Sequence, residues 1–130
     1  MHKPSDPGTK ISLFHPILIF LQEVTLSSEQ ILAQVSEEFD GLSNIDPNDP
    51  HKPGTAVLWR KETEVVVSNI VPLRLQVVYS DLYGNFINIY APTGNQGEKM
   101  RRTLFSEDLF YLINFLPSPP TLIGNFNFII

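Results

Sequence analysis

Three apolar runs in this 130-residue chain each end in a polar cluster, and this pattern constrains the fold most. Residues 17–21 lead into Gln22 and Glu23, residues 86–89 lead into Tyr-Ala-Pro-Thr-Gly, and residues 121–123 lead into Gly-Asn-Phe-Asn. In α/β proteins, buried strands give rigidity and the loops at their carboxyl ends carry the chemistry. The pattern therefore predicts an α/β fold in which three neighbouring strand ends form a small polar site.

Hydrophobic periodicity predicts the remaining elements. The continuous apolar run 17–21 is typical of a strand covered on both faces. A helix is expected to begin at Ser27 or Ser28 and to end at Gly41, because Ile31, Leu32, Val35 and Phe39 follow helical spacing. Residues 43–53 are expected to form an exposed loop. Strands are then predicted at 55–59, 64–70, 73–79 and 85–90, with a hairpin turn at 81–85.

Alternating apolar residues in 73–79 indicate that one face of this strand looks outward. A second helix is predicted after residue 97 and is stopped by Pro117. A last strand follows at 121–123, which gives the order β-α-β-β-β-β-α-β. The apolar stripe of the second helix is expected to consist of Met100, Leu104, Leu109, Leu112, Ile113 and Leu116.

Composition excludes several kinds of site. The net charge of −5 argues against binding to nucleic acid by bulk charge, although it does not exclude a nuclease that relies on metal ions. The absence of cysteine excludes disulfides, zinc–thiolate sites and thiol nucleophiles. Residues 1–10 are expected to be a disordered lead-in, and 11–130 a single domain. The apolar run 11–21 is too short to span a membrane and lacks a cleavage site, so a nuclear or cytoplasmic location is favoured over secretion.

Four segments, in this order along the chain, resemble the endonuclease/exonuclease/phosphatase family, and most of all the endonuclease domain of LINE-type retrotransposons. The segments are residues 19–23 (IFLQE), 54–58 (GTAVL), 87–95 (INIYAPTGN) and 122–127 (LIGNFN). The resemblance implies a deoxyribonuclease-I-like fold, a four-layer α/β sandwich in which two sheets pack together with helices outside. The chain would supply the first half of it without the first strand, so one sheet would expose a face through which the chain associates with itself.

The resemblance also implies metal-dependent hydrolysis of a phosphodiester in DNA. Glu23 matches the glutamate that holds Mg²⁺ or Mn²⁺, and Gln22 is expected to hold it in place. Tyr90 matches the tyrosine that reaches the scissile phosphate, and Asn127 the asparagine that helps hold phosphate and metal. Each also has a plain structural interpretation: a polar strand end for Glu23, a core-edge ring for Tyr90 and a turn residue for Asn127.

Asn125 departs from the family pattern, which has an aspartate that activates the attacking water. An amide cannot accept that proton, and losing a general base costs about 10²- to 10⁴-fold in rate. The family's later Ser-Asp-His motif is also absent from this sequence. We therefore expect this fragment to be inactive, and the alternatives are a non-catalytic relic or an interaction module. Arg101 and Arg102 are candidate nucleic-acid contacts, although a solvated helix face is the favoured interpretation.

Overall fold

Two β-sheets pack face to face in the computed structural model, which describes residues 16–49, 51–94 and 97–126. The three-stranded sheet has the order β1 (Leu18–Val24), β3 (Gly54–Arg60), β2 (Phe39–Asn44), and both pairings are antiparallel. The four-stranded sheet has the order β4 (Val66–Val71), β5 (Leu75–Ser80), β6 (Gly84–Tyr90), β7 (Thr121–Asn125). Only the β6–β7 pair in it is parallel. The expected lead-in at 1–10 lies outside the described residues.

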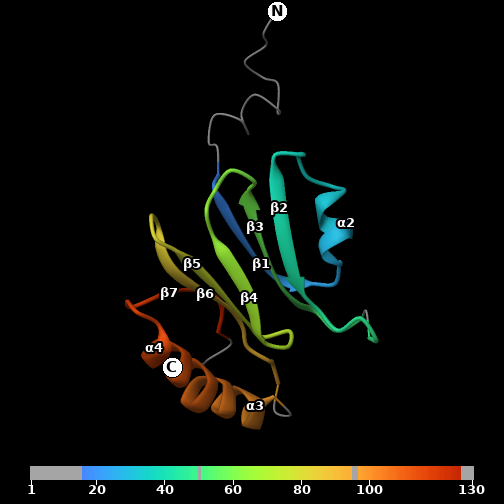
Figure 1. Cartoon of the computed structure of the whole chain (residues 1–130). Helices are drawn as coiled ribbons and strands as arrows, with labels where there is room; N and C mark the ends of the chain where they lie inside the picture. Colours follow the sequence, from blue (N-terminus) through green and yellow to red (C-terminus); the bar gives the residue numbers. More distant parts are fainter. Residues whose placement is uncertain (1–15, 50, 95–96, 127–130) are drawn as a thin grey trace, which may run out of the picture.

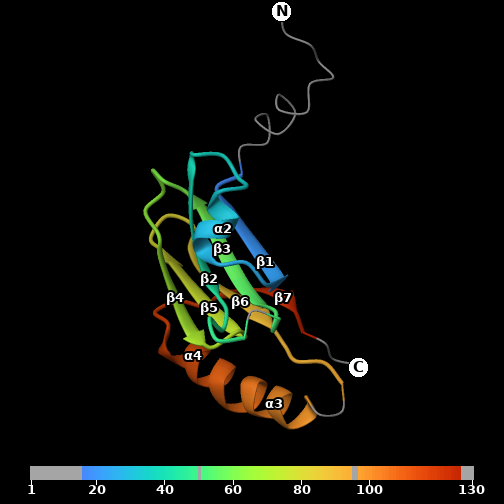
Figure 2. The same ribbon diagram turned by 90° about the vertical axis from the view of Figure 1, so that its right-hand side faces the viewer.

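Helices cover the outer face of each sheet, so the described chain has four layers (Figures 1 and 2). The short helix α2 (Ser28–Leu32) packs on the three-stranded sheet. A longer helical rod packs on the four-stranded sheet and consists of α3 (Glu98–Thr103), the π-helical segment η1 (Leu104–Leu109) and α4 (Phe110–Phe115). The predicted α/β class is thus confirmed. None of the described helices is both long and apolar enough to cross a membrane.

The alternation of side chains along β1 divides its residues between two interfaces. Ile19 and Leu21 pack toward α2 in the outer core. Phe20 and Gln22 point the other way, where the Phe20 ring lies 5.5 Å from that of Phe86 on β6. The inner faces of the two sheets therefore cover one another, which differs from the expected exposed sheet face. In the described structure the strands β1, β2, β4 and β7 are the sheet edges.

The central strand β5 is buried on both faces, and the predicted outward face of 73–79 is wrong. Leu75 and Val77 belong to the core beneath the helical rod, whereas Gln76 and Val78 are buried between the sheets. Only Tyr79 of this strand is exposed. The alternation suggested that the polar residue Gln76 faces solvent. Gln76 is instead buried, because hydrogen bonds inside the protein satisfy its side-chain amide.

The first predicted helix is correct at its start and wrong at its end. Ser27 forms a capping box with Gln30, but α2 ends at Leu32. Beyond it, residues 33–38 form turns, and the expected end of the helix at Gly41 lies in β2, which pairs with β3. Val35 and Phe39 still pack against the apolar cluster between α2 and the three-stranded sheet. Their helical spacing therefore arises because they face the same cluster as Ile31, and not because they continue its helix.

The second predicted helix is confirmed, with a change in its buried face. Leu104, Leu109 and Leu112 are buried, whereas Met100 and Ile113 are exposed. The π-helical segment η1 explains this change. Its turns contain more residues than α-helical turns, so the residues after it face a different direction from the one that regular α-helical spacing predicts. Leu116 is already extended, as is usual for the residue before a proline.

Candidate functional site

The three polar strand ends predicted from the sequence lie at one edge of the sandwich (Figure 2). Gln22 on β1 hydrogen-bonds to Asn88 on β6, two residues along each strand from the Phe20–Phe86 contact. The strands β1 and β6 therefore run in the same direction across the sheet interface. Because β7 is parallel to β6, with Asn125 opposite Tyr90, all three strands end on the same side.

Glu23 ends the regular pairing of β1 in an unusual conformation. It lies at a bulge between Gln22 and Val24 and has φ of 59°, in the left-handed region. Such a conformation costs a non-glycine residue about 1–2 kcal/mol, and strain of this kind clusters at functional sites. The side chain is exposed, borders a cavity of about 480 Å³ between β1 and α2, and has no hydrogen bond or ion pair within the described residues. Its carboxylate is therefore available to a cation.

Asn88 is fully buried between the sheets and ties them together beneath the strand ends. Its Oδ1 accepts from Gln22 Nε2 at 2.7 Å, and its Nδ2 lies 3.2 Å from Leu21 O and 3.1 Å from Ala56 O. The same Nδ2 lies 3.1 Å from Gln76 Oε1. Sequence reasoning gave Asn88 no role, although its position inside the apolar run 86–89 was a signal. The side chain of Gln22 is thus bonded to the other sheet, next to the bulge at Glu23.

Further amides extend this network to the far side of the sandwich. Gln76 Nε2 donates to Leu42 O at 3.0 Å and to Asn69 Oδ1 at 2.9 Å. Asn44 donates to the carbonyl oxygens of Val71 and Leu75 at 2.8 and 3.3 Å. We call Gln22, Asn44, Asn69, Gln76 and Asn88 the amide set. It includes residues from both sheets and fixes how one sheet lies over the other.

Tyr90 is buried at the end of β6 and is held by Arg74. Its backbone N–H donates to Arg74 O at 2.9 Å, and the guanidinium carbon of Arg74 lies 5.1 Å from the centre of the Tyr90 ring. Burial lowers the pKa of Arg74 from its ordinary value, and its interactions with Tyr90 oppose that change. Sequence reasoning missed Arg74, for which the only signal was a cation directly before a buried strand.

The third strand end depends on a glycine. Gly124 has φ of 139°, and a Cβ atom there would lie 1.9 Å from Ile89 O. Only glycine lets β7 approach β6 this closely. The next residue, Asn125, is half-buried, and its carbonyl accepts from Ala91 N at 2.9 Å. Asn127, the last of the predicted site residues, lies outside the described residues.

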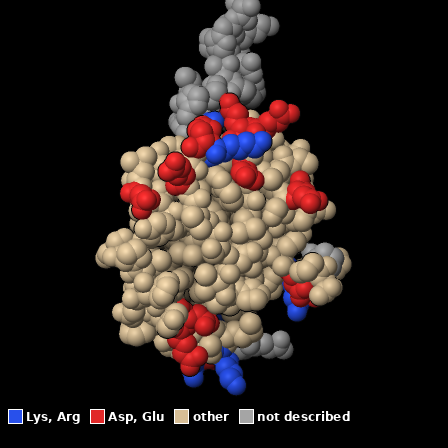
Figure 3. Space-filling model, in the orientation of Figure 1, with Lys and Arg blue, Asp and Glu red and all other residues tan. Residues whose placement is uncertain are grey.

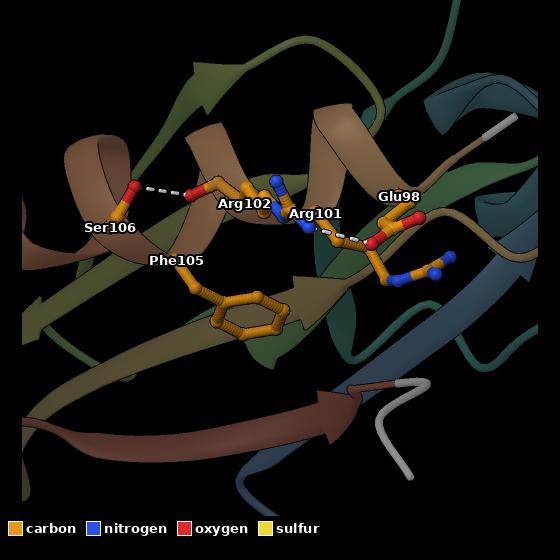
Figure 4. Close-up of a pocket in the computed structure, with 5 residues that line it drawn as sticks. All are labelled: Glu98, Arg101, Arg102, Phe105 and Ser106. Carbon is orange, nitrogen blue, oxygen red and sulfur yellow. Dashed lines mark hydrogen bonds and ion pairs between the residues drawn. The ribbon is translucent and has the colours of Figure 1, made fainter. Parts of the chain in front are cut away.

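Arg101 and Arg102 make contacts within the protein (Figure 4). Arg101 Nη1 donates to Pro92 O and Gly94 O at 2.8 and 2.9 Å, which ties the start of α3 to the loop after β6. Arg102 forms a 2.8 Å ion pair with Glu98 along the exposed helix face, while Phe105 points toward the sheet. The solvated helix face that the sequence favoured agrees with the position of Arg102.

The strand-end site offers few groups to a metal ion. Among the described residues, no three His, Cys, Asp or Glu side chains lie together as a metal site. Mg²⁺ is commonly held by one or two carboxylates together with substrate phosphates and water. Among the described strand-end residues, Glu23 supplies the carboxylate that a metal ion shared with a phosphate would use. No protein-family model matches this chain, and a search of curated proteins gives no match either.

Proposed function

We propose that this chain is a domain of the endonuclease/exonuclease/phosphatase type, related to the endonucleases of LINE-type retrotransposons. In this proposal its layers form part of a deoxyribonuclease-I-like sandwich. One observation carries the proposal: β1 lies parallel over β6, which brings Glu23, Tyr90 and Asn125 to a single edge. These residues occupy the strand-end positions that the sequence resemblance assigned to phosphodiester chemistry.

The proposed roles follow from the chemistry of each side chain. Glu23 would hold Mg²⁺ or Mn²⁺, which when bound neutralises charge on a phosphate and lowers the pKa of water. Tyr90 is fixed by Arg74 and would orient a DNA phosphate at the end of β6. Asn125 and Asn127 would donate hydrogen bonds to phosphate oxygens through their amides.

The same site is proposed to be inactive in hydrolysis. Asn125 lies opposite Tyr90, and the sequence resemblance assigns to it the position of the family's aspartate. An amide there donates to an oxyanion but cannot take a proton from water. The chain is therefore proposed to bind metal and nucleic-acid phosphate without efficient cleavage.

Nicking of supercoiled plasmid in Mg²⁺ tests this function. We expect the natural chain to nick no faster than Glu23→Ala, and Asn125→Asp to raise the rate by at most about 10²- to 10⁴-fold, because it restores a general base while the Ser-Asp-His motif stays absent. The double variant Glu23→Ala, Asn125→Asp is the matched control and should return to background. Asn125→Asp protein that is folded and does not nick would overturn the phosphodiesterase proposal.

A second candidate function, an interaction module, is favoured by the exposed apolar surface. Val66 and Ile70 of the edge strand β4 are 63% and 44% exposed, and this strand contains no charged residue. In Figure 3 the charged side chains lie toward the margins of this face and leave its middle uncharged. Open, uncharged edges favour pairing with another chain. Sedimentation velocity tests this: association that Ile70→Lys abolishes supports it, and a monomer at all concentrations contradicts it.

A further inference from the structure

Arg74 is a partly buried cation that has no carboxylate partner among the described residues. It precedes β5, and none of the ion pairs among the described residues includes it. Its Nε atom is buried and has no hydrogen-bond acceptor within the described structure, and Nη1 lies 3.4 Å from Tyr90 O. A buried charge of this kind is costly unless it is paired. The cation–π contact with Tyr90 offsets part of that cost, and an anion would offset more.

A cavity of about 250 Å³ lies beside Arg74, between the start of β5, the loop after β6 and the helix α3. Its lining includes a second cation, Lys99, together with Thr103 and Asp108. Neither Lys99 nor Asp108 forms an ion pair with another described residue. The charged lining therefore carries two positive groups and one negative group, which favours an anion over a cation.

The size and chemistry of the cavity indicate which anion it takes. Pockets for drug-sized ligands measure about 300–1,000 Å³, so this cavity suits a single small group. Guanidinium groups match phosphate geometry through paired N–H donors, and a lysine ammonium adds a point charge. We propose that Arg74 and Lys99 form a phosphate-binding subsite, separate from Glu23 and adjoining Tyr90. The phosphate group comes either from a nucleic-acid backbone or from a phosphate monoester.

This inference does not depend on hydrolysis or on a metal ion, so its test uses neither. The Arg Nε–H signals of ¹⁵N-labelled protein are followed by NMR in EDTA during separate titrations. The three probes are inorganic phosphate, thymidine 5′-monophosphate and hexathymidylate without terminal phosphates. We expect the Arg74 Nε–H signal to shift and saturate. Saturation by hexathymidylate identifies a backbone phosphodiester as the ligand, and saturation by the other two probes alone identifies a monoester.

Matched variants separate this subsite from general charge attraction. Lys99→Gln and Arg74→Lys should each weaken binding about 10-fold, because each removes charge-assisted hydrogen bonds. Arg74→Lys lacks the Nε–H reporter, so its binding is followed through the backbone amide signals of Tyr90 and Lys99. Lys99 is exposed, so its variant should fold normally. Arg102→Gln removes a similar charge outside the cavity and should leave the affinity unchanged. The absence of any Arg74 shift, or equal loss in Arg102→Gln and Lys99→Gln, would overturn the proposal. Binding without nicking by Asn125→Asp would overturn the phosphodiesterase function alone.

Discussion

At the scale of single residues, Asn88 connects the strands that carry the site although it is fully buried below it. Its side chain satisfies an amide on β1, an amide on β5 and backbone carbonyls on β1 and β3. Each buried polar group that loses its partner costs about 1–3 kcal/mol. The orientation of Gln22, and with it the bulge at Glu23, thus depends on one side chain on a neighbouring strand.

Asn88→Leu should therefore lower the free energy of unfolding by about 3 kcal/mol or more, as measured by urea denaturation. Leucine has the same number and branching of heavy atoms and is not smaller than asparagine, so it leaves no cavity and the loss reports the polar groups left unpaired. Asn114→Ala is the control, because within the described structure this exposed amide bonds only to Phe110 O on its own helix, at 2.8 Å. It should change stability by less than about 0.5 kcal/mol. If Asn88→Leu were as stable as the natural chain, the hydrogen bonds would not hold the sheets in place.

The sequence placed Glu23, Tyr90 and Asn125 at strand ends, and the structure brings those ends together. It did not reveal Asn88, Gln76 or Arg74 as their supports. Strand ends are visible in a sequence because apolar runs stop there, whereas support across a sheet interface depends on the register between sheets. That register is set by contacts between residues 66 positions apart, such as Gln22 and Asn88.

At the scale of elements, the close pairing of β6 and β7 requires Gly124. A methyl group at this position would overlap Ile89 O and would also disfavour the backbone conformation. The end of β7, and with it Asn125, depends on this approach.

Gly124→Ala should lower the free energy of unfolding by about 3 kcal/mol, since both overpacking and backbone strain contribute. Gly84 makes a matched control because its φ is also positive, at 91°, but a methyl group added there would meet nothing within 4 Å beyond its chain neighbours. Gly84→Ala should cost about 1 kcal/mol, for the backbone alone. Equal losses in thermal or urea unfolding would show that the contact with Ile89 does not constrain β7.

Elements with strong local signals were predicted well, and errors arose where tertiary packing decided. The capping box at Ser27 and the proline stop after Leu116 are local and are confirmed. The strand β2 was missed because its residue Phe39 packs in the same apolar cluster as α2. Phe39 therefore falls at helical spacing from the apolar residues of α2, and the pattern predicts a single helix. Gly41 lies in that strand, where a Cβ would lie 2.5 Å from Leu58 Cδ2, so the residue expected to end a helix instead allows close packing.

At the scale of the whole molecule, contacts between the sheets should make the described layers unfold together. The single tryptophan, Trp59, lies on β3, whereas all four tyrosines follow residue 78 and report on the four-stranded sheet and its helices. We expect urea transitions followed by Trp59 fluorescence and by tyrosine absorbance to have the same midpoint and slope. A lower urea midpoint for Trp59 fluorescence than for tyrosine absorbance would show instead that the three-stranded sheet unfolds independently.

The sequence predicted the class of fold and the existence of two helices, but not that the sheets would cover each other. Periodicity identifies the apolar faces of a strand and does not identify what covers them. The polar residue Gln76 on an inner face also made one face of 73–79 look like a candidate for solvent. Its hydrogen-bond partners lie on other strands, so only the assembled sandwich reveals it as buried.

The amide set has a consequence for how the molecule responds to its surroundings. Its side chains and the carbonyl oxygens they contact carry no ionisable group, so no part of it gains or loses a proton between acid and alkaline solution. Salt, which screens charges, also acts weakly on such neutral contacts. The strand ends should therefore keep their mutual alignment across a wide range of pH and ionic strength. Any change in ligand binding over that range would then originate in the charged groups around the strand ends and not in the amide set.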